Sequence, residues 1–318
     1  YDFFHYLIFT LQKSVSIVEY TYIMSISRQN LSVIIVSFKS NHVIEHCIES
    51  IDEEIRIIVV ENSNDSLLKK KLEKKYENVR CILSDKNIGM GAGNNLGLRY
   101  VTTDFVLILN PDVKLEKDAI SELIKASKKI DSFGLLSPIS DNLKNPNYKR
   151  FKEEKIFDYE NPFKVKSIDG YSMLLNFTKI KMIKDFKFFD ENFFLYLEND
   201  DLCLRLTRLN ENIYIIPKSK INHLGGKTVD PKYKYEIELS RNWHWMWSKF
   251  YYNKKHYGYL NALYKVLSNL ISAIFKYFYF LFTFNRHQRK IYFMRLSGLF
   301  NSIIGKSSWY RPKTKKID

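Results

Sequence analysis

Short apolar runs alternate with amphipathic segments along the first half of the chain. The apolar runs are mostly rich in β-branched residues and predict five buried strands, over 31–38, 55–62, 79–83, 104–110 and 133–138. Between them, apolar residues recur at helical spacing, most clearly over 43–51 and 117–130. Strands that alternate with helices predict an α/β fold with a doubly wound, mainly parallel sheet and helices on both faces.

The second half returns to this pattern after a polar, Asn- and Lys-rich stretch over 139–167. Strands are predicted over 170–177 and 212–217, with a helix near 178–184. A later helix over 259–284 has an apolar line formed by Leu260, Leu263, Leu267, Leu270, Ile274, Phe278 and Leu281. The narrow opposite side of this helix carries Lys265, Asn269, Ser272 and Lys276.

The charge of the chain is concentrated in the segment that begins at residue 239. The net charge is +15, but residues 239–318 hold fifteen Lys or Arg and one acid, so this segment carries +14 and the rest +1. We expect an extension over 1–30 without a signal peptide or a clean membrane span, a body over 31–238, and a helical basic tail over 239–318. A basic tail on a nearly neutral body argues against a nucleic-acid-binding domain.

Polar residues gather where the predicted strands end. They are Ser37, Glu61 and Asn62, Asp85 to Asn87, and Asn110 to Asp112. Ligands of doubly wound sheets bind beyond the carboxyl ends of the strands, so these residues predict a binding site. The three cysteines form no CxxC pair, which argues against a disulfide scaffold or a structural zinc site and favours a reducing compartment.

The glycine-rich segment NIGMGAGNNLG (87–97) lies inside this predicted site. Its spacing fits neither GxGxxG nor the P-loop pattern. Gly89, Gly91 and Gly93 would allow the backbone to approach a nucleotide closely. The alternative is a flexible loop that leads into a helix.

Asn110-Pro111-Asp112 follows an apolar strand and places Asp112 where a divalent cation would bridge it to a diphosphate. The same sequence is also favourable for a simple turn. His223, just after another predicted strand, would complete the metal site through its imidazole, although a lone histidine is more often structural.

Four polar residues interrupt the apolar segment LYLENDDLCLRL (195–206). Adjacent carboxylates repel one another, and burial raises that cost unless a cation or hydrogen bonds compensate. If a helix begins here, Glu198 and Asp201 share one face, and a pair between Asp201 and Arg205 would make Asp201 an orienting group. The simpler interpretation is a helix start whose first-turn acids are favoured by the helix dipole.

Six segments together resemble glycosyltransferase family 2. They are IIVSFKS, VVENSND, NIGMGAGNN, LILNPD, FFDENFFLYLENDDLCLR and the later His223, in the order and approximate spacing of the family. The resemblance spans about 31–228 and is closest to the rhamnosyltransferase-like members, which build bacterial surface polysaccharides. It implies a GT-A fold and inverting transfer from a nucleoside-diphosphate sugar.

The resemblance also implies roles for individual residues. Asp112 would be the acid that holds Mg²⁺ or Mn²⁺ beside the donor, with His223 as the later metal-site histidine. Glu198 and Asp201 match the acids of the family's Glu-Asp-x-Asp-Leu pattern. The residues expected around the nucleotide are Ser37, Glu61, Asn87, Gly89 and Asn95.

Three positions depart from the family's pattern. Glu61 stands where an aspartate is usual, and Asn110 replaces the first acid of the Asp-x-Asp element. Asn199 occupies the position of the catalytic base, and an amide cannot accept a proton at neutral pH. We therefore expect Glu198 to be the base, with Asp200 as the second candidate.

The sequence thus predicts an inverting glycosyltransferase that uses a dTDP- or UDP-sugar, rhamnose being the leading guess. Its acceptor would be a glycan or a polyprenyl-diphosphate-linked sugar. The basic, amphipathic tail would hold it on anionic lipid at the cytoplasmic face of the cell membrane. The alternatives are an impaired nucleotide-sugar- or membrane-binding scaffold, a sugar-nucleotide nucleotidyltransferase and, third, an RNA-binding protein. The alternative for the tail is a helix that only packs on the body and whose charges are solvated.

Overall fold

The computed structural model describes residues 25–142, 144–151, 159–225 and 228–314. Most of the predicted 1–30 extension therefore lies outside the described residues. Residues 25–30 precede the first strand and already belong to the fold, because the Ile26 side chain is buried in the core.

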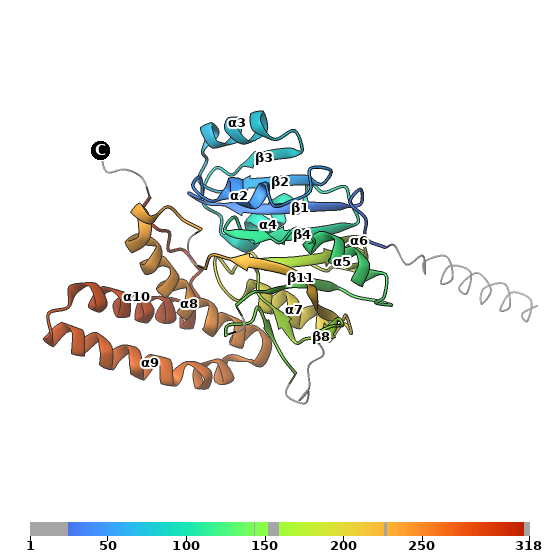
Figure 1. The fold of residues 1–318 in the computed structure, drawn as a ribbon. Helices are drawn as coiled ribbons and strands as arrows, with labels where there is room; N and C mark the ends of the chain where they lie inside the picture. Colours follow the sequence, from blue (N-terminus) through green and yellow to red (C-terminus); the bar gives the residue numbers. More distant parts are fainter. Residues whose placement is uncertain (1–24, 143, 152–158, 226–227, 315–318) are drawn as a thin grey trace, which may run out of the picture.

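A mixed sheet forms the centre of the molecule (Figure 1). Its first four strands are parallel and have the order β3 (Val79–Leu83), β2 (Arg56–Glu61), β1 (Leu31–Ser37) and β4 (Phe105–Leu109). The order continues through β10 (Ser172–Asn176), β6 (Leu135–Ser140), β11 (Ile213–His223) and β5 (Val113–Leu115), and β8 (Phe163–Lys164) pairs with β11. All five strands predicted in the first half are confirmed within a few residues.

The neighbours of two strands differ from a simple parallel order. The last strand of the first half, β6, does not pair with β4, because β10 lies between them and is antiparallel to both. β11 continues six residues past the predicted end at Pro217, through an irregularity between Ile216 and Lys220. Its extension pairs antiparallel with β5 and sets His223 opposite Val113.

Helices cover both faces of the sheet, as predicted. One face is covered by α2 (Ile44–Ile48), α3 (Ser66–Lys75) and α5 (Ala119–Ser127). The other is covered by α4 (Met90–Leu98), α6 (Phe177–Lys181) and α7 (Glu198–Arg208). A short antiparallel pair, β7 (Tyr148–Lys149) with β9 (Ser167–Ile168), lies beside α7.

Three long helices follow the sheet. After a 3₁₀ turn over Pro231–Tyr233 come α8 (Lys234–Tyr257), α9 (Tyr259–Phe282) and α10 (Arg286–Ile303), and α9 and α10 form a hairpin beside the sheet domain (Figure 1). The close packing of α10 on α8 requires Gly298, since a Cβ there would lie 2.1 Å from the Trp243 carbonyl oxygen. The expected division between residues 238 and 239 falls inside α8, which packs directly on the sheet domain.

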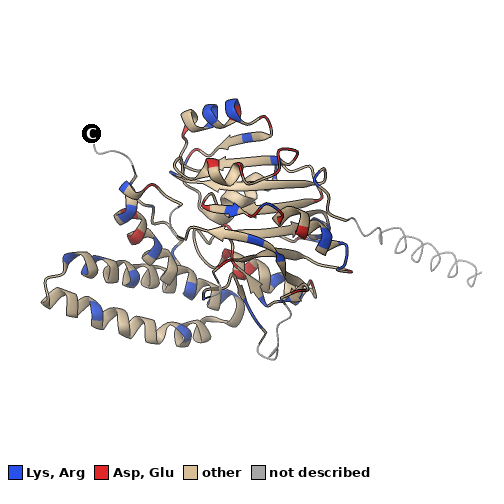
Figure 2. Cartoon of the chain, viewed as in Figure 1, with Lys and Arg blue, Asp and Glu red and all other residues tan. Residues whose placement is uncertain are grey.

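The α9–α10 hairpin carries Lys and Arg but no Asp or Glu (Figure 2). Of the described helices, α9 alone has the length and mean hydropathy, 1.2, that a membrane span requires. Its inward side packs on α8 and α10 through Ala262, Val266, Leu263 and Leu270. Its exposed apolar stripe is therefore shifted from the predicted line, and consists of Leu260, Tyr264, Leu267, Ile271, Ile274, Phe275, Phe278 and Phe282.

Candidate active site

A cleft of about 640 Å³ opens where β1 and β4 end, beside the end of β11 and the start of α7. It lies where the polar strand ends predicted a binding site. Of the residues named from the sequence, those that line the cleft are Asn62, Asn87, Gly89, Asn110, Glu198, Asn199, Asp200 and His223. Ser37, Glu61, Asn95, Asp112 and Asp201 are not among its lining residues.

Asp112 and His223 lie side by side, and His223 lines the cleft. The pairing of β5 with β11 brings His223 Nε2 to 3.5 Å from Asp112 Oδ1. Both Asp112 carboxylate oxygens and Asn110 Oδ1 are buried and accept no hydrogen bond from the described residues. Burial opposes the ionisation of Asp112, but His223 outweighs it and holds the pKa of the carboxyl below its usual value. Unpartnered buried oxygens are costly, so this group has the chemistry of a cation site.

The described residues contain no cluster of three or more His, Cys, Asp or Glu, so Asp112 and His223 stand as a pair. The ring of Tyr171 stacks on His223 at 3.9 Å between centroids and fixes the imidazole plane. The backbone carbonyl of Tyr171 also accepts a hydrogen bond from Asn110 N at 3.0 Å. A cation held here would therefore have two charged or basic ligands and one neutral amide oxygen available.

Glu61 is buried and shapes a loop. Its carboxylate accepts hydrogen bonds from Ser63 N at 3.0 Å, Asp65 N at 2.6 Å and Ser63 Oγ at 2.5 Å. Asp65 in turn caps α3. The extra methylene of Glu61 compared with aspartate thus reaches the backbone of the next turn. Ser37 Oγ is buried with no hydrogen bond to the described residues.

Asn62, to which the sequence gave no specific role, organises the wall formed by Asn87 and Gly89. Its Nδ2 donates to Gly89 O at 3.1 Å and to Asn87 Oδ1 at 3.2 Å, and its Oδ1 accepts from Ile88 N at 3.1 Å. Gly89 has φ +91°, and a Cβ there would lie 2.3 Å from the Phe194 carbonyl oxygen. In the sequence, the position of Asn62 at the end of a predicted strand was the signal for a role in the site.

The other glycines of this segment lie in α4 and serve packing. A Cβ at Gly93 would lie 2.8 Å from the Val36 side chain, so glycine allows α4 to rest closely on β1. Asn95 ties α4 to the segment before α7: its Nδ2 donates to Phe189 O at 2.9 Å and its Oδ1 accepts from Phe189 N at 3.1 Å. The segment is thus a short loop up to Gly89 that leads into the helix α4 at Met90.

Glu198 is the first residue of α7 and has the most perturbed carboxylate of the cleft. The side chain is buried and its Oε2 accepts no hydrogen bond from the described residues. Burial, reinforced by the charge of Asp200, raises its pKa to about 7. A carboxyl group with this pKa can take a proton near neutral pH, which suits a general base.

Asn199 and Asp200 have partners. Asn199 Nδ2 donates to Ile168 O at 2.8 Å, which fastens the start of α7 to β9. Lys149 Nζ lies 2.7 Å and 2.8 Å from the two carboxylate oxygens of Asp200, from the neighbouring strand β7. Asp200 is therefore already paired with a cation, whereas Glu198 is not.

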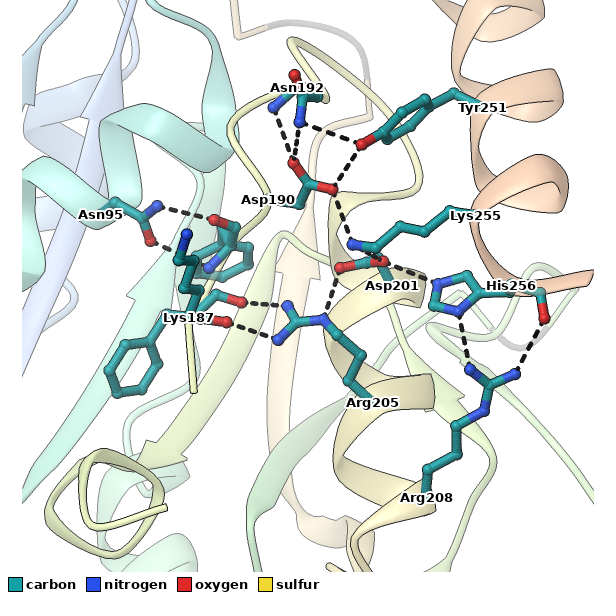
Figure 3. A network of polar contacts seen from close by, with 12 residues as sticks. Asn95, Lys187, Asp190, Asn192, Asp201, Arg205, Arg208, Tyr251, Lys255 and His256 are labelled. Carbon is teal, nitrogen blue, oxygen red and sulfur yellow. Dashed lines mark hydrogen bonds and ion pairs between the residues drawn. The ribbon is translucent and has the colours of Figure 1, made fainter. Parts of the chain in front are cut away.

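Asp201 points away from the cleft, into a network between α7 and α8 (Figure 3). Its fully buried carboxylate contacts Arg205 Nε at 2.8 Å, Lys255 Nζ at 2.6 Å and His256 Nε2 at 2.8 Å. Lys255 also reaches Asp190 at 2.7 Å. The Asp201–Arg205 pair expected from the sequence is present, and the geometry is that of an orienting group.

The mixed sheet, the helices on its two faces and the cleft at the strand ends have the arrangement of the GT-A fold. Residues 32–188 match the family model described as glycosyl transferase family 2. This segment, just under half of the chain, matches the domain of the family 2 glycosyltransferases.

Two curated relatives are similar to this chain in sequence. The low-salt glycan biosynthesis hexosyltransferase Agl10 of Haloferax volcanii is 28% identical over 201 residues, which cover 58% of this chain and 64% of that protein. The rhamnosyltransferase WbbL of Escherichia coli is 28% identical over 214 residues, which cover 58% of this chain and 80% of that protein. The chain thus spans just under two thirds of the length of Agl10.

A solved structure shares the fold. The mannosyltransferase PcManGT from Pyrobaculum calidifontis, in complex with GDP-Man and Mn²⁺, superposes with a TM-score of 0.53 at 11% identity. The superposition covers 87% of this chain and 88% of that chain. It supports the GT-A architecture predicted from the sequence.

Proposed function

We propose that this chain is an inverting, metal-dependent glycosyltransferase that acts in the synthesis of a surface polysaccharide. It moves a sugar from a dTDP- or UDP-linked donor to a glycan or a lipid-linked acceptor. Rhamnose is the leading donor sugar because WbbL is a rhamnosyltransferase. The observation that supports this proposal most is the buried, unpartnered carboxylate of Glu198 in the cleft that also exposes His223.

Asp112, His223 and the amide oxygen of Asn110 would hold a divalent cation, Mg²⁺ or Mn²⁺. Their unpartnered oxygens suit a hard cation, and the structure of PcManGT, which shares the fold, is a complex with GDP-Man and Mn²⁺. When bound, such a cation neutralises the negative charge of a leaving diphosphate.

Glu198 acts as the base. The acceptor hydroxyl oxygen forms a bond to the anomeric carbon while the bond from that carbon to the diphosphate oxygen breaks. Glu198 takes the hydroxyl proton, a role that typically contributes ~10²–10⁴-fold. Asp200, the second candidate, is held by Lys149 and contributes to the raised pKa of Glu198.

The α9–α10 hairpin attaches the enzyme to the cytoplasmic face of the membrane, as a peripheral contact with anionic lipid. Two properties support this part of the proposal. The stripe on α9 is strongly exposed, with Leu260 at 81% and Phe275 at 71%. The hairpin also carries basic residues without acids, which suits a surface of anionic headgroups.

Donor turnover by the purified chain tests the enzymatic proposal. The protein is incubated with Mn²⁺ and a panel of dTDP- and UDP-sugars, and the released nucleoside diphosphate is measured with and without glycan acceptors. We expect release with at least one donor, and loss of most of it in Glu198→Gln. Glu53→Gln is the matched control, because Glu53 is exposed and is not among the residues that line the cleft.

The binding of Mn²⁺ is measured separately by the loss of its free electron paramagnetic resonance signal in the presence of a nucleoside diphosphate. We expect Asp112→Asn to weaken this binding. A chain that binds nucleotide and Mn²⁺ but turns over no donor would instead be the impaired scaffold that Asn110 and Asn199 suggest. Absence of both binding and turnover would refute the proposed function altogether.

A further inference from the structure

The helix α8, which follows the family 2 segment, contributes a wall to the cleft. Ile237, Arg241 and Trp245 all line the cleft, and their spacing of four residues places them on one side of the helix. No role for this helix followed from the sequence, where it was part of the basic tail. Its cleft-facing side is a second wall opposite the nucleotide-binding strand ends.

This wall is fastened to the turn that carries Glu198. Ser248 Oγ donates to Leu195 O at 2.8 Å, and the Tyr196 ring meets Trp245 edge-on at 5.5 Å between centroids. Tyr196 and Leu197 are consecutive residues with φ of +70° and +67°. Left-handed backbone at two successive non-glycine residues needs support from its surroundings, and it occurs preferentially at functional sites.

Arg241 is a cation without a counterion among the residues that the structure describes. It makes no hydrogen bond or ion pair to the residues that the structure describes, although it lines the cleft. Its charge acts on the Tyr196 hydroxyl, whose pKa is raised by burial and lowered by Arg241. Lys149, the other Lys or Arg that lines the cleft, is neutralised by Asp200. Arg241 is thus available for an anion, and guanidinium groups bind phosphate oxygens well.

Trp245 adds a surface for a sugar ring. The residue is 40% exposed although it lines a cleft, and Tyr196 supports the edge of its ring. Aromatic side chains combine a large apolar face with little conformational freedom, which suits the apolar face of a pyranose. An exposed indole on the same wall as an unpaired guanidinium matches a sugar that carries a phosphate.

We propose that α8 and the turn before Glu198 form the acceptor subsite for a sugar phosphate or sugar diphosphate. Trp245 and Tyr196 hold the acceptor sugar with its hydroxyl toward Glu198, and Arg241 binds the phosphate attached to that sugar. The inference rests on the proposed function and names its acceptor class. The acceptor hydroxyl loses its proton to Glu198 and forms the new glycosidic bond, and the nucleoside diphosphate leaves with the electron pair of the broken bond.

Direct binding to the full chain tests this subsite. The protein is first saturated with UDP and Mn²⁺, so that the donor site is filled, and is then titrated calorimetrically with farnesyl-diphosphate-linked N-acetylglucosamine. We expect Arg241→Gln and Trp245→Ala each to weaken binding at least tenfold. The matched controls are Arg99→Gln and Tyr235→Ala, because Arg99 and Tyr235 are exposed and absent from the cleft lining. Both controls should bind within twofold of the unchanged chain.

Two further titrations distinguish the alternatives. Glucose 1-phosphate that binds as well as the lipid-linked probe identifies a soluble sugar phosphate as the acceptor, whereas a preference for the lipid-linked probe identifies a lipid-linked one. UDP with Mn²⁺ should bind all variants within twofold. A tenfold loss of UDP binding in Arg241→Gln would assign Arg241 to the donor and overturn the proposal, as would the failure of the chain to bind either probe. Failure of UDP and Mn²⁺ to bind the unchanged chain would instead refute the proposed function.

Discussion

At the scale of single residues, the site depends on how burial changes a carboxylate. Glu198 and Asp200 are two residues apart, yet Asp200 has Lys149 as a partner and Glu198 has none. The sequence was sufficient to rank Glu198 first, because Asn199 removed the usual base. It could not provide the reason, since Lys149 reaches Asp200 from a strand fifty residues earlier.

The rate of sugar transfer should rise with pH through the pKa of Glu198. Only the ionised carboxylate accepts a proton, and that pKa is about 7, so the rate should increase from pH 6 to pH 8 and then level off. Asp200 contributes to the raised pKa of Glu198 and is paired with Lys149, and Arg241 lines the same cleft. The measurement is kcat against pH at saturating donor. A rate that is flat from pH 5.5 to 8 would exclude Glu198 as the base.

Glu198→Gln should stabilise the protein at high pH while it abolishes transfer. Between pH 4.5 and 7 the folded state holds a proton on Glu198 that the unfolded state has released, so stability falls as pH rises through this range. A shift of this size corresponds to about 3 kcal/mol at pH 8, and glutamine, which does not ionise, avoids the loss. Urea unfolding at pH 5 and pH 8 measures the difference. An equal effect of the substitution at both pH values would show that ionisation of Glu198 does not lower the free energy of unfolding.

Asn199→Asp should not restore the family's usual base. The amide of Asn199 donates to the Ile168 carbonyl, and an ionised carboxylate at this position would face that oxygen as a second acceptor. We expect a loss of about 1–3 kcal/mol of unfolding free energy at pH 8. Asn199→Ala, which removes the donor without adding charge, should lose less at pH 8. At pH 4 the protonated aspartate can donate again and the difference should shrink. A more active Asn199→Asp variant would contradict this account.

At the scale of elements, the sequence predicted five strands of the first half, but it missed the short strands β5 and β7 and did not predict the neighbours of β6. The apolar runs that form β1 to β4 are local signals, and helical spacing between them implied parallel neighbours. The insertion of β10 between β4 and β6 depends on pairing across more than sixty residues with β4 and about forty residues with β6, which a local pattern does not encode. The extension of β11, which delivers His223 to Asp112, is hidden for the same reason, because Pro217 resembles a strand end.

The contact between α7 and α8 should be a major source of stability. Asp201 is fully buried among Arg205, Lys255 and His256, so a neutral residue there removes the negative charge that these three side chains share. We expect Asp201→Asn to lower the free energy of unfolding by about 3–5 kcal/mol. Chemical unfolding measures the effect, with Asp185→Asn as the control because Asp185 is exposed. A loss below that of the control would mean that the network carries no net stabilisation.

At the scale of the whole molecule, the basic tail predicted from charge has two different sides. Its first helix, α8, packs on the sheet domain and reaches the cleft through Arg241 and Trp245. Its hairpin, α9 with α10, presents an apolar stripe and basic side chains outward. Charge counting located the tail, but helical spacing in the sequence could not tell which leucines of α9 face α8. The proposed acceptor wall on α8 therefore lies beside the hairpin surface for which we propose a contact with lipid.

That arrangement predicts binding to vesicles that depends on charge. Arg286 and Lys290 are exposed at the start of α10, and each basic residue near an anionic surface adds about 1 kcal/mol. Arg286→Gln with Lys290→Gln should therefore weaken cosedimentation with phosphatidylglycerol vesicles roughly 30-fold and leave the negligible binding to phosphatidylcholine vesicles unchanged. Lys70→Gln with Lys74→Gln removes the same charge from α3, and should have little effect because that helix covers the sheet away from the hairpin. Equal losses in the two double variants would show that net charge alone, rather than the α9–α10 surface, attracts the protein to lipid.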